Sequence, residues 1–191
     1  MCEEHGADAL GFIFYKESKR YVTPVEAKAI TKRLSPFTMK VGVFVNETPE
    51  KIKKIASEVK LDLVQLHGDE NPEFLEGINF PVIKSFRIKD DFDFDILNEY
   101  KDCSYLFDTY TKDGYGGSGK IFNWDIIPKN LLDAIILSGG ISINNIEKVY
   151  GTLNPSAVDL SSSLESEPGR KNENKVKEFF KKIHSLRSKT W

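Results

Sequence analysis

The sequence is poor in cysteine and has no long apolar run. Its 191 residues hold two cysteines, Cys2 and Cys103, too few for a disulfide framework or a cysteine-rich metal site. No stretch is long and apolar enough to span a membrane, and no basic start with an apolar centre marks a signal peptide. The 27 basic and 29 acidic residues give a net charge of −2, which indicates neither nucleic acid nor an anionic membrane as a partner. We therefore expect a protein of the reducing cytoplasm, with no nucleic-acid or membrane partner.

The chain has instead the composition of an ordinary globular protein, with 40% hydrophobic and 29% charged residues. Short apolar runs rich in Val and Ile recur along it. Because they are too short for helices, they predict strands that are buried on both faces. Seven such runs begin at Leu10, Val41, Leu61, Phe80, Ser104, Ala134 and Ser156.

Helix start signals stand between these runs. Thr23-Pro24, Thr48-Pro49 and Asn71-Pro72 each place an N-cap residue before a proline, and a glutamate follows within two residues. Later helices are expected to open within Ser142 to Asn145 and at Glu173. Strands that alternate with helices predict βα units and a parallel sheet.

The length of the repeating unit indicates the architecture. Seven units in 191 residues are roughly 27 residues each, close to the unit length of a TIM barrel, in which about 250 residues form eight units. We therefore expect one domain over residues 1–191 with the α/β fold of a (βα)8 TIM barrel. A seven-stranded open sheet with helices on both faces is the competing architecture.

The amino-terminal residues are typical of the tail of a helix, with Gly6 as its C-terminal stop. A complete first βα unit would need roughly 25 more residues. We therefore expect the first strand of the barrel and most of its first helix to be missing from this chain. The alternative is that the protein begins here and closes its sheet differently.

Small residues follow the last two predicted strands, in "LSGG" and "DLSSS". In parallel αβ folds ligands bind at the carboxyl ends of strands, and small residues there let backbone N–H groups reach an anion. Each piece alone is also compatible with a tight turn or a helix cap, but the pair at consecutive strand ends predicts a phosphate site. Its candidate residues are Gly139, Gly140, Ser161 and Ser162, with Asp159 at the base of the last loop.

Other polar residues also follow predicted strands. Asp108 is a candidate general acid or base, although an Asp at a strand end can also simply cap its own loop. Arg20 has a planar fork suited to a carboxylate or phosphate, and otherwise is a solvated charge. His67 is a candidate substrate contact, but a lone His is more often structural. Lys84 is given no role, because its side chain could point to either face of the predicted strand.

Several motifs occur together and in a fixed order, from "GFIFYKESKRYV" through "QLHG", "LFDT" and "YGGSGKIFNW" to "LSGGI" and "VDLSSSLESEPGRK". Together they resemble phosphoribosylanthranilate isomerases of tryptophan biosynthesis, over almost the whole chain. The resemblance implies a (βα)8 barrel that binds a small phosphoribosyl substrate. It also implies an Amadori rearrangement of N-(5-phosphoribosyl)anthranilate to the carboxyphenylamino deoxyribulose phosphate, without metal or organic cofactor. The oligomeric state is left undetermined.

The resemblance also implies roles for single residues. Asp108 matches the family's general acid, and Arg20 matches the arginine that holds the anthranilate carboxylate. The phosphate turns match Gly139, Gly140, Ser161 and Ser162. The four glycines at positions 114, 116, 117 and 119 match a loop that closes on the substrate and excludes water.

One departure concerns the general base, which in the family is a cysteine in a "K-I-C-G" stretch on the first strand. No such stretch occurs here. Cys2 precedes Gly6, and Cys103 stands before a strand and not after it. We therefore expect little turnover from the chain as given.

Three other interpretations remain open. Another phosphate-binding barrel enzyme, such as an indole-glycerol-phosphate synthase, would need a lysine-based acid and base, and the glycine loop argues against it. A non-catalytic phosphosugar-binding barrel is the alternative from a different class. The missing strand could also be supplied by a fused or partner protein.

Overall fold

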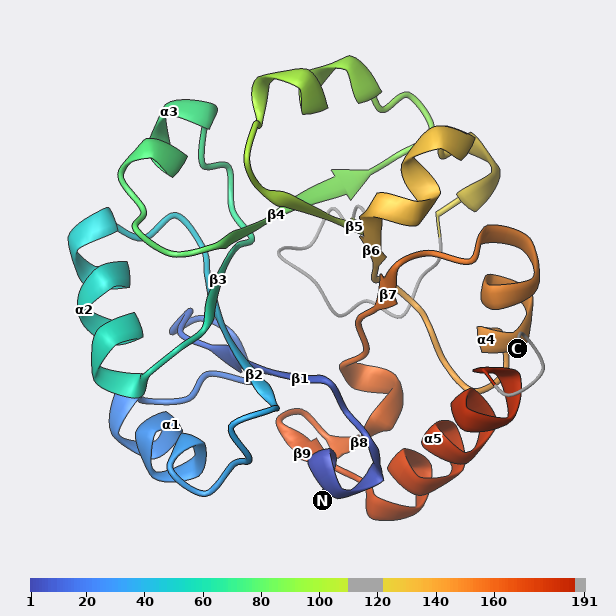
Figure 1. Ribbon diagram of the computed structural model, residues 1–191, viewed down its shortest axis with the longest axis horizontal. Helices are drawn as coiled ribbons and strands as arrows, with labels where there is room; N and C mark the ends of the chain where they lie inside the picture. The colour runs from blue at the N-terminus through green and yellow to red at the C-terminus, as the bar shows by residue number, and fades with distance from the viewer. Residues whose placement is uncertain (110–121, 188–191) are drawn as a thin grey trace. The chain divides into compact units, whose positions relative to one another are not determined.

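The computed structural model describes residues 1–109 and 122–187 (Figure 1). They fall into two compact units, which we describe separately: Met1–Ser85 with Phe94–Cys103, and Phe86–Asp93 with Ser104–Trp191. The expectation of a single domain stays a prediction. The glycine loop at positions 114–119 lies outside the described residues.

The first unit is built on parallel strands. They are β1 (Ala9–Ile13), β2 (Met39–Phe44), β3 (Leu63–Leu66) and β4 (Val82–Ile88), whose last three residues belong to the second unit. Each strand pairs in parallel with the next one, for example Phe12 with Gly42 and Gln65 with Ile83. Parallel neighbours of this kind require crossover connections, which the helices provide.

The helices of the first unit begin where the sequence predicts. Helix α1 (Pro24–Thr31) starts with a capping box, in which the Thr23 side chain accepts the N–H of Glu26 and Glu26 accepts the N–H of Thr23. Helix α2 (Pro49–Val59) starts at the Thr48 cap, and α3 (Pro72–Glu76) at the Asn71 cap. The 3-10 helices η1 (Glu3–His5) and η2 (Phe94–Glu99) complete the unit. Gly6 ends η1 with φ of 100°, as expected of a C-terminal stop.

The core of the first unit lies between its strands and helices α1 and α2. Figure 1 shows α1, α2 and α3 along one face of strands β1 to β3. Helix α2 buries one stripe against the strands, and each fully buried aliphatic side chain of this kind contributes about 1.5–3 kcal/mol. The stripe consists of Ile52, Ile55, Ala56 and Val59, and it meets Phe44, Val64 and Leu66 in one cluster.

The second unit also contains parallel strands, β5 (Ser104–Thr109), β6 (Ile135–Leu137) and β7 (Ala157–Val158). Strand β6 pairs with β5 on one side and with β7 on the other. Short helices lie between these strands in the sequence, namely η3 (Trp124–Ile126), η4 (Lys129–Ala134), α4 (Ile146–Lys148) and the π-helical η5 (Val149–Leu153).

After β7 the chain forms the 3-10 helix η6 (Ser162–Leu164) and an antiparallel hairpin of β8 (Glu165–Glu167) and β9 (Arg170–Lys171). Helix α5 (Glu173–Arg187) follows and lies beside α4 (Figure 1). Lys182 of α5 forms an ion pair with Glu147 of α4. Phe86 packs edge-to-face against Tyr105 and Phe107. This aromatic cluster anchors β5, the strand that carries Asp108.

All seven strands expected from the apolar runs are present, and the pairs between them are parallel, so the predicted α/β class is confirmed. The hairpin β8–β9 and the short helices η2 to η4 were not predicted. None of the helices in residues 1–109 and 122–187 is long and apolar enough to cross a membrane.

Candidate active site

Asp108 stands next to the last residue of β5, and it is almost fully buried, with 5% of its surface exposed. Its Oδ1 accepts the backbone N–H of Thr109 at 2.8 Å. Strand β5 places the carboxylate because Leu106 and Phe107, the two residues before it, are locked in the core. The predicted acid is therefore held in a low-exposure position at the carboxyl end of a parallel strand, where such folds bind their ligands.

The turn after β6 lies against this carboxylate. Gly139 and Gly140 have φ of 81° and 70°, a region that side chains other than glycine rarely adopt. A Cβ on Gly139 would collide with Thr109 Oγ1, would lie 2.7 Å from Thr109 N and would be 2.8 Å from Asp108 Oδ1. Glycine is therefore required at position 139 both by backbone conformation and by the closeness of Asp108.

Side chains brace the same turn. Asn145 closes it, because its Nδ2 donates to Gly140 O at 2.9 Å and its Oδ1 accepts the N–H of Ser142 at 2.8 Å. Ser138 Oγ donates to Asp159 Oδ2 at 3.1 Å and so connects the ends of β6 and β7. The turn is thus fixed by bonds at both of its ends.

The loop after β7 carries the predicted serines. Ser161 precedes η6, and Ser162 begins it; both side chains are half-buried. Lys171 Nζ, from β9, donates to Ser161 O at 2.9 Å and lies 3.3 Å from Glu165 Oε1. The hairpin β8–β9 therefore supports this loop and brings a positive charge to it.

The first unit holds the other two predicted residues, Arg20 and His67. Arg20 follows β1 and is half-buried, and its backbone N–H donates to Ser18 Oγ at 3.2 Å. His67 directly follows β3, and its Nδ1 is 2.9 Å from Gln65 Nε2. Gln65 Nε2 also donates to Ser85 Oγ at 3.2 Å. The histidine ring is therefore oriented by a side chain of its own strand.

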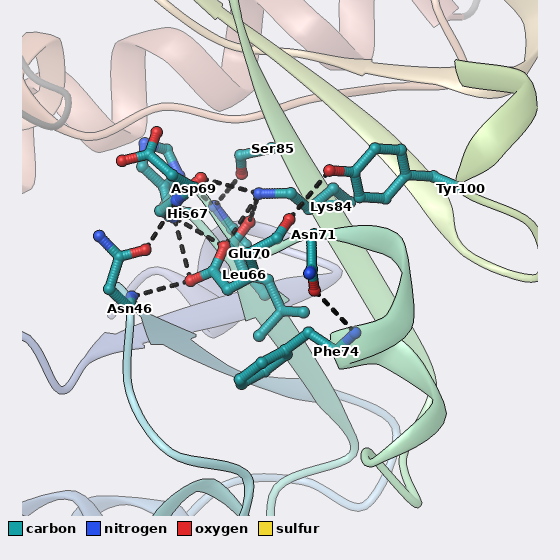
Figure 2. A network of polar contacts seen from close by, with 12 residues as sticks. Asn46, Leu66, His67, Asp69, Glu70, Asn71, Phe74, Lys84, Ser85 and Tyr100 are labelled. Carbon is teal, nitrogen blue, oxygen red and sulfur yellow. Dashed lines mark hydrogen bonds and ion pairs between the residues drawn. The ribbon is translucent and has the colours of Figure 1, made fainter. Parts of the chain in front are cut away.

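Lys84 belongs to a buried polar network at the end of β3 (Figure 2). Its ammonium is 2.9 Å from Glu70 Oε2, and both side chains are almost completely buried. Tyr100 Oη donates to the backbone carbonyl of Glu70 at 2.9 Å. Burial and the negative charge of Glu70 raise the pKa of Tyr100, which keeps this hydroxyl a donor.

Cys103 precedes β5, as the sequence indicated, and therefore stands at the amino end of that strand. Burial raises the pKa of its thiol, which disfavours the thiolate needed in a base. Within residues 1–109 and 122–187, no three His, Cys, Asp or Glu side chains are grouped so as to hold a metal ion.

The predicted site residues thus divide between the units. Asp108, Gly139, Gly140, Asp159, Ser161 and Ser162 lie in the second unit, where the structure brings Gly139 against Asp108. Arg20 and His67 lie in the first. Sequence reasoning missed Thr109, Asn145 and Lys171. The position of Thr109 directly after Asp108 and the Ser-Ile-Asn-Asn motif after the glycines were signals that could have found the first two.

Known proteins resemble this chain over almost its whole length. The family model of N-(5'phosphoribosyl)anthranilate isomerase matches residues 1–182. The curated N-(5'-phosphoribosyl)anthranilate isomerase of Geobacter sulfurreducens is 44% identical over 189 residues, which are 98% of this chain and 91% of that protein. The enzyme of the same name from Thermotoga neapolitana is 46% identical over 187 residues, with coverages of 96% and 91%.

Solved structures of such isomerases have the same fold as this chain. The phosphoribosyl anthranilate isomerase of Thermotoga maritima superimposes with a TM-score of 0.88 at 42% identity, over 96% of this chain and 91% of that one. A second such isomerase, in complex with reduced 1-(o-carboxyphenylamino)-1-deoxyribulose 5-phosphate, gives 0.84 at 38% identity, also over 96% and 91%. By sequence and by structure, this chain belongs to the N-(5'-phosphoribosyl)anthranilate isomerase family.

Proposed function

We propose that this protein isomerises N-(5'-phosphoribosyl)anthranilate to 1-(2-carboxyphenylamino)-1-deoxyribulose 5-phosphate in tryptophan biosynthesis, in the cytoplasm. One observation supports the roles that we assign to single residues. The buried carboxylate of Asp108 lies directly against Gly139, in the turn proposed to bind phosphate. An acid and an anion-binding turn on neighbouring strands suit a phosphorylated sugar whose ring must open.

Asp108 is the proposed general acid. Its proton passes to the ribose ring oxygen, the C1–O bond breaks, and a protonated imine forms between C1 and the anthranilate nitrogen. A base, in the extended chain the cysteine of the "K-I-C-G" stretch, takes the C2 proton and gives an enaminol, which tautomerises to the aminoketose. C1 is reduced as C2 is oxidised within one molecule, so the reaction needs no external electron carrier.

The phosphate is proposed to bind between Gly139-Gly140 and the loop that carries Ser161 and Ser162. Two successive glycines with positive φ leave their N–H groups unobstructed by side chains. Lys171 adds a positive charge behind Ser161. Asp159 orders the base of this site through Ser138.

Arg20 and His67 are the proposed contacts of the first unit. The guanidinium of Arg20 can form paired, charge-assisted hydrogen bonds with the anthranilate carboxylate. His67 offers a ring nitrogen to an acceptor oxygen of the substrate. Binding energy from contacts of this kind can orient a substrate for reaction.

A fluorescence assay of phosphoribosylanthranilate consumption tests the proposal. It compares this chain with one extended upstream by a first βα unit that carries the family's "K-I-C-G" stretch. We expect the extended chain to turn over, and Asp108→Asn to lower its kcat about 10²–10⁴-fold. Turnover that survives Asp108→Asn would contradict the acid assignment.

The second candidate function is a phosphosugar-binding barrel without catalysis. The turns after β6 and β7, braced by Asn145 and Lys171, would serve such a barrel equally well. Binding of the reduced product analogue by both chains, with turnover by neither, would establish this function in place of the isomerase.

A further inference from the structure

The buried ion pair of Lys84 and Glu70 is costly. Lys84 is 2% exposed and Glu70 is 5% exposed, and their charged atoms are 2.9 Å apart. Removing each ion from water costs several kcal/mol, and apolar residues of similar volume often give equal or greater stability. Stability alone therefore does not account for two charges in this position.

The bonds of Lys84 converge on the backbone around His67. Its Nζ donates to Gly68 O at 2.8 Å and to Leu66 O at 3.5 Å (Figure 2). Leu66 and Gly68 are the two chain neighbours of His67. The Lys84 ammonium, which β4 carries, therefore holds the main chain on both sides of the histidine.

Glu70 fixes the same segment from the other direction. Its carboxylate accepts the N–H of Gly68 at 3.0 Å and the N–H of Asn46, which follows β2, at 2.8 Å. Asn46 Oδ1 in turn accepts the N–H of Asp69 at 2.7 Å. The segment is so close to Asn46 that a Cβ on Gly68 would collide with it.

Gln65 acts on the ring itself. Its Nε2, which also donates to Ser85 Oγ, is 2.9 Å from His67 Nδ1. The amide nitrogen of Gln65 can only donate, so His67 Nδ1 accepts this hydrogen bond and carries no proton. The neutral ring is therefore protonated on Nε2. The backbone and the tautomer of His67 are thus set by different side chains.

We infer that the Lys84–Glu70 pair and Gln65 are positioning residues for His67. The pair fixes the segment Leu66–Glu70, and Gln65 selects the Nε2-protonated ring, which donates to an acceptor oxygen of the substrate. This inference rests on the proposed function, in which His67 contacts the phosphoribosyl anthranilate.

The ring nitrogens of His67 can be observed directly. The chain has three histidines, so long-range ¹H–¹⁵N spectra resolve each ring, and His67→Gln identifies the signals of His67. We expect the Nε2-protonated pattern in the parent chain. Gln65→Leu should convert it into a mixture of tautomers with the fold unchanged.

The ion pair is tested with both charges removed, because a single substitution would leave one charge buried and unpaired and would by itself cost about 3–5 kcal/mol of stability. We expect Lys84→Met with Glu70→Gln to broaden the His67 signals and to weaken binding of reduced 1-(o-carboxyphenylamino)-1-deoxyribulose 5-phosphate about tenfold. The matched control is Lys40→Met with Asp62→Asn. It removes a lysine–carboxylate pair of 2.7 Å near the start of β2, and should change neither readout.

The outcomes separate the inference from the function on which it rests. Parent-like His67 spectra and parent-like affinity in the Lys84/Glu70 double variant would overturn the inference. Parent-like affinity in His67→Phe, which has no side-chain donor, would overturn its functional part, because His67 would then not contact the ligand. Failure of both the parent chain and the extended chain to bind the analogue would refute the proposed function, whereas the tautomer in Gln65→Leu would still decide the positioning role.

Discussion

Gly139→Ala is the substitution for which the structure gives the clearest magnitude. The residue has φ of 81°, and a methyl group there would collide with Thr109 Oγ1 and come within 2.8 Å of Asp108 Oδ1. A non-glycine residue in the left-handed region costs roughly 1–2 kcal/mol. Overpacking against buried groups adds about 1–3 kcal/mol. We therefore expect the free energy of unfolding to fall by about 2–5 kcal/mol.

Urea denaturation followed by tryptophan fluorescence measures this change, because buried Trp124 lies in the same unit as Gly139. Gly151→Ala is the matched control. Gly151 is exposed, and a Cβ there would meet nothing within 4 Å. Because Gly151 lies in η5 with open space around it, its substitution should leave the free energy of unfolding unchanged or raise it by up to about 1 kcal/mol.

The same substitution also tests whether the turn and the carboxylate are coupled. To relieve the collision, Thr109 and Asp108 must shift, and misplacement of a catalytic group by about 1 Å can cost on the order of 10²-fold in rate. We therefore expect the turnover of the extended chain to fall by a factor on the order of 10². The assay is run without urea, at a temperature where the variant is folded. A loss of less than about 1 kcal/mol in stability, with unchanged turnover, would refute the packing argument.

Three further changes have defined outcomes. Arg20→Met should weaken binding of the reduced product analogue by roughly 10–100-fold, the loss of a charge-assisted hydrogen bond, with no effect on inorganic phosphate in calorimetry. Lys171→Met should instead weaken phosphate binding roughly fivefold, since it removes the bond to Ser161 O; equal phosphate affinity would contradict the predicted site. Hydrogen bonds from Thr38 and Ser35 lower the pKa of Glu3, so its contribution to stability is present above the unfolded pKa and is lost as the pH falls through the folded pKa. Glu3→Gln should therefore flatten the acid side of a plot of urea midpoint against pH, and an unchanged slope would contradict this origin.

Much of the fold was predictable because it depends on local patterns. The apolar runs predicted all seven parallel strands, and Thr23, Thr48 and Asn71 each cap the helix that they were expected to cap. The hairpin β8–β9 was not predictable, because its strands have two or three residues and no alternating apolar pattern.

The environment of single polar residues was less predictable. Lys84 stands in an apolar run where either face was open to it, and its partner Glu70 lies fourteen residues earlier on a different segment. Asp108 was identified from its place after a strand, but its contact with Gly139 depends on how β5 and β6 pair. Such contacts between distant residues leave no trace in the spacing of one sequence.

The closed bonding of the segment Leu66–Glu70 has a consequence for how relatives can diverge. Loss of either Lys84 or Glu70 alone leaves a buried charge and costs about 3–5 kcal/mol, a large part of the 5–15 kcal/mol that holds a typical domain folded. Exchange of both for apolar residues avoids the unpaired charge, but it leaves the N–H groups of Gly68 and Asn46 and the carbonyl of Gly68 without these partners. Each route by which a relative could lose the pair therefore passes through a less stable protein.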